Sequence, residues 1–182
     1  MSRIKAILYI MFFVGCPVFY LNAQVASVTS GNWNNTSTWD CSCIPDFNSG
    51  TITISSFTTV TIPNGFTADA DEIIVDSDGA LNVNSGGRLI VRDGTGDDLT
   101  ITIGDGFFTF DGLLTVDAGG VLENRGTIVS SSSNLIINGT FQHNRNGGSI
   151  PEASWNSGSL LEITGITNTA PTGLNQVFYN IT

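Results

Sequence analysis

The sequence predicts an all-β protein whose strands wind into a parallel β-helix, that is, a β-solenoid. After Gln24, no window of helical length has apolar residues at a 3.6-residue period. Short runs of β-branched residues instead alternate with turns rich in glycine, asparagine and aspartate. One short sequence unit also recurs along the chain. Together these observations exclude a helical bundle.

Residues 1–23 are predicted to be a cleaved signal peptide. Arg3 and Lys5 open the chain, residues 6–21 are almost all apolar, and Ala23 is a small residue at an acceptable cleavage site. The apolar run contains a glycine and a proline, and it is shorter than the roughly 20 residues of a membrane-spanning helix. A membrane anchor is therefore the weaker alternative. A lipid anchor on Cys16, in a poor lipoprotein box, is weaker still.

The composition restricts the classes of partner. The 182 residues include 6 Lys or Arg and 16 Asp or Glu. Removal of residues 1–23 leaves 4 basic and 16 acidic residues, a net charge of −12. A chain this acidic has no basic face for nucleic acid. The leader predicts a secreted protein or one on the outer cell surface, with no transmembrane span.

Residues 24–50 are predicted to be an N-terminal cap. An open end of a solenoid exposes apolar side chains and unpaired strand edges, and bulky aromatic side chains can cover it. Trp33 and Trp39 suit this role. The alternative is that these indoles, together with Trp155, form a platform on which a sugar stacks.

Cys41 and Cys43 are the cysteines that remain after cleavage of the leader. Export makes a disulfide between them permissible, provided that the chain turns between the two residues. Two free thiols are the alternative. The mature chain has no second cysteine or histidine pair, so a structural zinc site is excluded.

Residues 51–182 are predicted to form the solenoid. Its clearest strands are short segments in which β-branched residues alternate or concentrate. They are 51–54, 59–62, 99–103 and 113–116.

The recurring unit starts at Val75, again at Val83, and a third time, after a much longer interval, at Val116. Each copy has glycine at its fifth position and leucine at its seventh. Short strands joined by glycine corners indicate stacked coils. A β-sandwich or jelly roll is the competing fold, but its strands usually have longer connections. The side chains predicted to point inward are Val75, Leu81, Val83, Leu89, Val91, Val116 and Leu122, and the predicted equivalent corners are Gly79, Gly87 and Gly120.

Several segments resemble a known class of module. The matching segments are Gly31-Asn32-Trp33, Thr38-Trp39, Ile44-Pro45 and 60–65, followed by 85–89, 124–128 and 155–165. This series resembles G8-type domains and the parallel β-helix modules in large secreted surface proteins of Bacteroidota. The resemblance implies a β-helix in an exported polypeptide. Because the chain ends in a strand-like segment without a polar cap, we expect it to be truncated within a larger exported protein.

Candidate chemistry is sparse. Asp93, Asp97 and Asp98 lie on a glycine-containing loop, so calcium is a weak candidate ligand and no other cofactor is predicted. A second acidic cluster is Asp69, Asp71 and Glu72. His143, the single histidine, is expected on the surface. No catalytic constellation is visible.

These features predict a non-catalytic structural or adhesion module that binds a neutral glycan or a surface protein. The alternative is a polysaccharide-acting enzyme or a carbohydrate-binding domain, because both kinds of protein use β-helix scaffolds. A third hypothesis is a flat ice-binding face built from Thr-x-Thr pairs, but few such pairs recur at one spacing.

Overall fold

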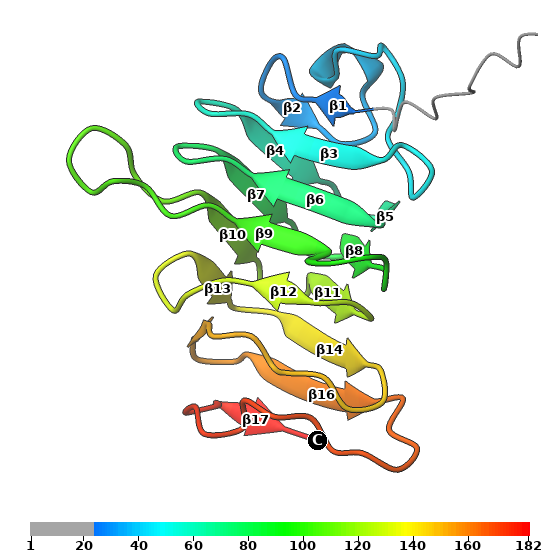
Figure 1. The fold of residues 1–182 in the computed structure, drawn as a ribbon, viewed down its shortest axis with the longest axis vertical. Coiled ribbons are helices and arrows are strands. Elements are labelled where there is room, and N and C mark those ends of the chain that lie inside the picture. Colours follow the sequence, from blue (N-terminus) through cyan, green and yellow to red (C-terminus); the bar gives the residue numbers. More distant parts are fainter. Residues whose placement is uncertain (1–23) are drawn as a thin grey trace, which may run out of the picture.

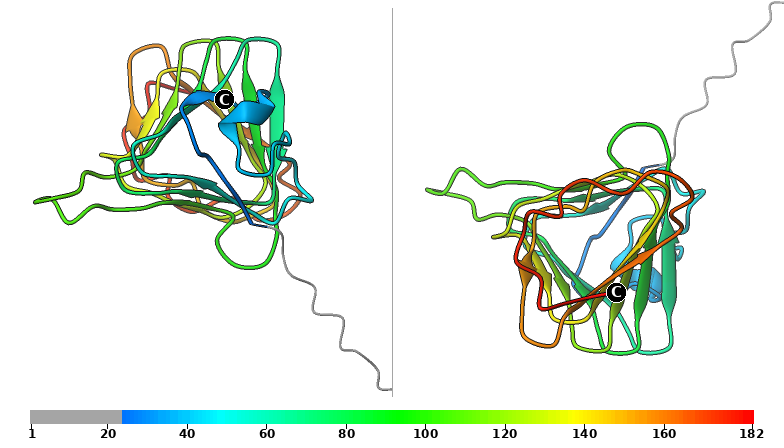
Figure 2. Two further views of the ribbon diagram at one scale, coloured as in Figure 1. Left: turned by 90° about the horizontal axis from the view of Figure 1, so that it is seen from above. Right: turned by 90° about the horizontal axis from the view of Figure 1, so that it is seen from below.

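The computed structural model describes residues 24–182, which form a three-sided parallel β-helix (Figure 1). Seen along its axis, the chain follows a roughly triangular path with one sheet on each side (Figure 2). The predicted fold class is confirmed, since the strand ladders within the sheets are parallel. The predicted signal peptide lies outside the described residues. Residues 24–182 contain no helix that is long and apolar enough to cross a membrane.

Each sheet is a column of strands. The first sheet contains β1 (Val25–Ala26), β3 (Thr51–Ile54), β6 (Glu72–Val75), β9 (Leu99–Ile101) and β12 (Ile128–Val129). The second sheet contains β2 (Gly31–Asn32), β4 (Thr59–Ile62), β7 (Ala80–Val83), β10 (Leu113–Val116), β13 (Leu135–Ile137) and β15 (Ser154–Trp155). The third sheet contains β5 (Thr67–Ala70), β8 (Arg88–Val91), β11 (Val121–Asn124), β14 (Thr140–Asn144), β16 (Leu160–Thr164) and β17 (Asn180–Ile181).

One coil of the solenoid takes one strand from each sheet. In β3, β4, β7 and β8 buried and half-buried residues alternate, because successive side chains of a strand point to opposite faces. The inward residues fill a continuous apolar core. All seven side chains that were predicted to point inward are buried.

The coil period differs from the spacing of the recurring unit. Thr51 pairs with Glu72 and Thr59 with Ala80, so one regular coil leads from each of these residues to its partner. The short interval from Val75 to Val83 is only the step from one side of a coil to the next. The longer interval joins Val83 to Val116, which are neighbours in the second sheet although two inserted loops separate them in sequence. The recurring sequence unit therefore marks the corners within a coil. The period of a whole coil was not predicted.

The prediction of three equivalent corners is right for Gly87 and Gly120, which both lie between the second and third sheets, and wrong for Gly79, which lies between the first and second sheets. The three turns share a local geometry, although none of these glycines has a positive φ itself. In each corner, the preceding residue has the positive φ: Asp78 (62°), Gly86 (76°) and Gly119 (83°). A Cβ on Gly87 would lie 2.6 Å from the Ile62 carbonyl oxygen of the coil above. Glycine is needed there because the two backbones approach closely.

The N-terminal segment closes one end of the core. Its strands β1 and β2 extend the first and second sheets, so they form an incomplete first coil (Figure 1). A 3₁₀ helix, η1 (Thr36–Thr38), follows β2. Trp33 and Trp39 are 0% and 1% exposed, and their rings meet edge to face at 5.1 Å between centroids.

Candidate functional site

A cluster of exposed apolar side chains lies on the connection between β9 and β10. Residues 102–112 form this connection, which we call the aromatic loop, and it projects from the corner between the first and second sheets (Figures 1 and 2). Its large apolar side chains are 67–83% exposed. They are Ile103, Phe107, Phe108 and Phe110. Apolar side chains clustered and exposed in this way usually mark a surface that binds something.

A carboxylate organises the tip of the aromatic loop. Asp105 Oδ1 accepts hydrogen bonds from the backbone N–H groups of Phe107, Phe108 and Thr109 at 2.7–2.9 Å. These three bonds lower the pKa of Asp105 to about 2, since they stabilise the charged form. The tip therefore carries a fixed negative charge beside two phenyl rings, which pack edge to face at 4.5 Å.

The base of the aromatic loop is attached to the coil above. Asp78 N–H donates to the Phe110 carbonyl, and Asp78 Oδ1 accepts from Phe110 N–H, both at 3.0 Å. Gly112 N–H donates to Thr102 C=O at 2.8 Å and closes the neck of the loop. These hydrogen bonds thus hold the loop in one conformation, at its tip through Asp105 and at its base through Asp78.

A recess of about 400 Å³ lies beneath this loop. Phe110 and Leu113 give it apolar walls, and Thr109, Asp111 and Ser133 give it polar groups. Ser133 Oγ donates to Asp111 Oδ2 at 3.0 Å. An aromatic wall next to a few oriented oxygens is the usual composition of a small-ligand site.

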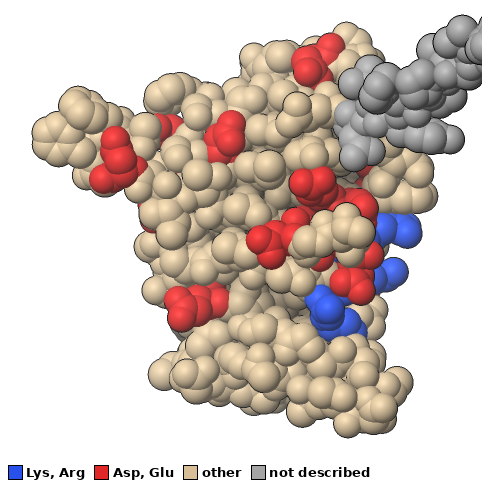
Figure 3. Space-filling view, in the orientation of Figure 1, with Lys and Arg blue, Asp and Glu red and all other residues tan. Residues whose placement is uncertain are grey.

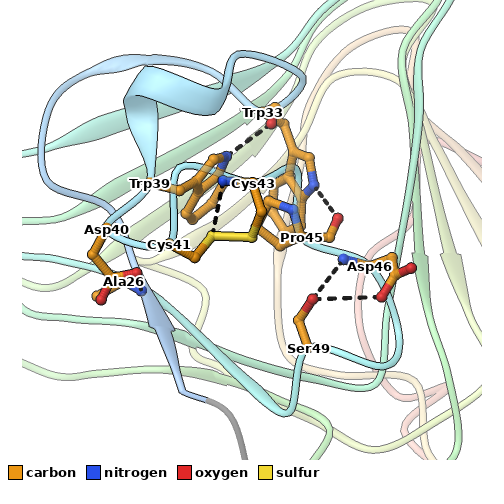
Figure 4. The surroundings of a disulfide bond; sticks show 9 residues. All are labelled: Ala26, Trp33, Trp39, Asp40, Cys41, Cys43, Pro45, Asp46 and Ser49. Atoms are coloured by element: carbon orange, nitrogen blue, oxygen red, sulfur yellow. Dashed lines mark hydrogen bonds between the residues drawn. A yellow bond between two sulfur atoms is a disulfide. The ribbon is translucent and has the colours of Figure 1, made fainter.

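The three tryptophans occupy packed positions. Trp33 Nε1 donates to Pro45 C=O at 3.0 Å, and Trp39 Nε1 donates to Trp33 C=O at 2.8 Å (Figure 4). Because both rings are buried, neither offers a face to a sugar, and the stacking alternative is wrong for these two residues. Trp155 is half-buried between Phe141 and Phe178, and its Nε1 donates to Gln176.

Cys41 and Cys43 form a disulfide in the cap segment, with 5.1 Å between their Cα atoms (Figure 4). Ser42 between them has a φ of 53°, which supplies the turn that such a short bridge requires. The bridge lies just before Pro45, whose carbonyl holds the Trp33 indole. It therefore constrains the strand-free segment that packs on the two indoles.

The acidic residues proposed for calcium do not converge. Asp98 is buried and accepts hydrogen bonds from the backbone N–H groups of Gly94 and Thr127, both at 2.6 Å. Asp93 faces Arg145 at 3.5 Å, while Asp97 is exposed. No group of three acidic, histidine or cysteine side chains within residues 24–182 could hold a metal ion. The second acidic cluster forms no common site either, because the Asp69 carboxylate is engaged by two hydrogen bonds from Arg92.

The basic side chains gather beside the third sheet, among acidic ones (Figure 3). Glu123 has almost no exposed side-chain surface, yet its carboxylate is charged. Arg125, Asn144 and Arg88 donate to it, and these bonds outweigh desolvation and lower its pKa to about 2. Each of these arginines thus contacts a carboxylate of the protein, and Arg88 and Arg125 share that of Glu123.

His143 is buried, so the expectation of a surface histidine was wrong. It lies at an inward position of β14, directly below Asn124 of β11. Its Nε2 bonds to the Gly147 carbonyl at 2.8 Å, while Nδ1 has no partner among the described residues. Desolvation lowers the pKa of His143, so the ring is neutral at pH 7.

The aromatic loop was missed at the level of sequence, although a signal was present. Three phenylalanines occur within the segment 107–110, directly after an Asp-Gly turn. Apolar residues at a turn have no inward direction to take, so they predict an exposed patch. No protein-family model, curated protein or solved structure matches this chain. The fold and this loop therefore define its class: a parallel β-helix that carries an ordered aromatic loop on one corner.

Proposed function

We propose that this protein is a non-catalytic binding module, secreted or held on the outer cell surface, and that its aromatic loop binds a neutral glycan. The observation that carries this proposal is the exposure of Phe107, Phe108 and Phe110 on an ordered loop above a recess with oriented oxygens. The C–H faces of a sugar ring pack against phenyl rings, and its hydroxyls donate to carboxylates.

Charge favours a neutral ligand over an anionic polymer. The mature chain has a net charge of −12, which includes the carboxylates of Asp78, Asp105 and Asp111 in the loop region, where no basic residue lies nearby in sequence. Like charges repel over about 8 Å at physiological salt. A sulfated or uronate polymer would therefore meet repulsion at this corner.

A glycan array followed by calorimetric titration of the best neutral oligosaccharide tests the proposal. The double variant Phe107→Ala, Phe108→Ala should lower affinity about tenfold or more, because two aromatic contacts are lost. Its melting temperature should not change, since both rings are more than 80% exposed. Val177→Ala is the matched control, because Val177 is 90% exposed on a different coil.

The proposal fails if no neutral oligosaccharide binds or if the double variant binds as tightly as the parent protein. Product release from the bound oligosaccharide would instead support the polysaccharide-acting enzyme. Partitioning of the parent chain, but not of the double variant, into phosphatidylcholine vesicles would reassign the aromatic loop to a lipid surface.

A further inference from the structure

The corner between the first and second sheets carries a further exposed phenylalanine. Phe57 lies on the connection between β3 and β4, and its side chain is 83% exposed. The aromatic loop leaves the same corner two coils below, on the connection between β9 and β10. Figure 1 shows both connections on one edge of the molecule, with the connection between β6 and β7 between them. The exposed phenyl rings of this corner therefore extend beyond the aromatic loop itself.

Backbone hydrogen bonds join Phe57, Asp78 and Phe110 into one column. Phe57 N–H donates to Asp78 C=O, and Asp78 N–H donates to Phe110 C=O, both at 3.0 Å. Each bond joins neighbouring coils, whose backbones are about 4.8 Å apart. The backbones of the two phenylalanines are thus separated by two coil steps, about 10 Å along the solenoid axis. Asp78 lies midway between them.

The backbone of Phe57 has a conformation that its side chain disfavours. Its φ is 62°, in the left-handed region that bulky residues rarely adopt. The similar turn at the next corner of the coil has Gly65 at the corresponding position, with a φ of 75°. Because the Phe57 ring is exposed, its burial does not offset this strain. A strained residue without a packing role indicates a function at the surface.

The carboxylate of Asp78 is oriented within the column. Its Oδ1 accepts the hydrogen bond from Phe110 N–H, which fixes the side chain. Its Oδ2 accepts no hydrogen bond from residues 24–182 and is not buried. This oxygen can therefore accept a hydrogen bond from a ligand hydroxyl, and such bonds to a charged acceptor are strong.

We propose that the glycan bound by the aromatic loop is a linear, extended chain, which runs parallel to the solenoid axis from Phe110 past Asp78 to Phe57. This inference rests on the proposed function and adds Phe57 to its site. A sugar residue in an extended chain, such as a β-1,4-linked glycan, is about as long as one coil step of about 4.8 Å. Consecutive sugars then lie over consecutive coils. The outer sugars pack on the two phenyl rings, and the middle sugar donates to Asp78.

The test is a calorimetric titration of the mature chain with neutral β-1,4-linked oligosaccharides of glucose, mannose or xylose, from the disaccharide to the hexasaccharide. Affinity should rise with chain length until the chain reaches Phe57. Phe57→Asn should weaken binding of the hexasaccharide about fivefold, because one aromatic contact is lost, and should leave the disaccharide affinity unchanged. Its melting temperature should not fall, since asparagine adopts a positive φ more readily than phenylalanine. Val177→Asn is the matched control, because Val177 is 90% exposed on a different coil.

The inference is wrong if affinity does not rise with chain length or if Phe57→Asn binds the hexasaccharide as tightly as the parent protein. The proposed function survives either result, provided that the double variant Phe107→Ala, Phe108→Ala still loses binding. A lower melting temperature of Phe57→Asn would show that the ring stabilises the fold, and this would also overturn the inference. If none of these chains binds while another neutral glycan binds at the aromatic loop, the extended ligand alone is refuted. If no neutral glycan binds, both proposals fail.

Discussion

The coils of residues 51–91 and of residues 128–164 are built to the same plan but differ in two respects. The upper coils have complete ladders on all three sides, while the lower coils lack one in the first sheet. The inward column of the third sheet also changes, from Val91 in the upper part to Asn124 and His143 below it. The inward side chains of the upper part are uniformly apolar.

This difference indicates which coils of the solenoid contribute most to its stability. Inward aliphatic side chains and continuous ladders cooperate from coil to coil. Where polar residues replace them, buried groups lose partners, as Asn124 Nδ2 and His143 Nδ1 do within the described residues. An unpartnered buried polar group costs about 1–3 kcal/mol. We therefore expect the lower coils to open locally more often than the upper coils.

Truncation of an inward leucine should give the largest effect. Leu89→Ala removes a fully buried side chain from the upper stack and should lower the free energy of unfolding by about 2–5 kcal/mol, because it leaves a cavity. Ile163→Ala in the lower coils should cost less, since Ile163 is only half-buried. Urea unfolding measures both. Equal losses would contradict the distinction between the two regions.

A corner substitution should have the next largest effect. Gly87→Ala places a Cβ 2.6 Å from the Ile62 carbonyl oxygen, so the two coils must shift apart, at a cost of about 1–3 kcal/mol. The matched change is Gly158→Ala in the lower coils. Gly158 has a φ of 89° but no neighbour within 4 Å, so that change should cost only the backbone strain, about 1 kcal/mol. Thermal unfolding should therefore give a lower melting temperature for Gly87→Ala than for Gly158→Ala. The reverse order would refute the explanation that the backbones of two coils approach closely at Gly87.

Mild acid should produce the smallest loss in the free energy of unfolding, and this loss should arise in the lower coils. Burial lowers the pKa of His143 in the folded protein below its ordinary value near 6.5, and the positive charge of Arg145 acts in the same direction. The unfolded chain thus binds the proton more readily than the folded one. The stability from the neutral ring is complete above pH 6.5 and is lost as pH falls from 6.5 toward the folded pKa.

The variant His143→Leu should remove this dependence. Because His143 is the single histidine of the sequence, unfolding free energies of the parent chain between pH 7 and 5.5 report mainly on this ring. The variant should show a flatter profile over that range, with stability at pH 7 changed little, since an unpartnered nitrogen and a bond to Gly147 are lost together. An identical slope in both proteins would show that His143 does not titrate with unfolding.

The fold was predictable because its signals are local. Alternation placed Leu81 and Leu89 inward, and glycine marked the corners. The coil period was hidden because inserted loops separate β8 from β9 and β9 from β10, so paired residues are not evenly spaced. The burial of His143 follows from a register that becomes visible only when β11 and β14 are aligned. The direction of the Ile128 backbone groups depends on which alternate residues of β12 bond to β9. The amino-acid composition does not determine this.

The insertion between β9 and β10 has a consequence for how such a protein changes over time. Leu114 pairs with Leu81 in the same register that joins Leu81 to Val60, although the chain makes a long detour before Leu114. A corner thus tolerates extra residues without moving the strands on either side, and each doubling of loop length costs only about 0.6 kcal/mol in closure entropy. Under the proposed function, exchange of this one loop would therefore change ligand preference while the strands of the stacked coils keep their register.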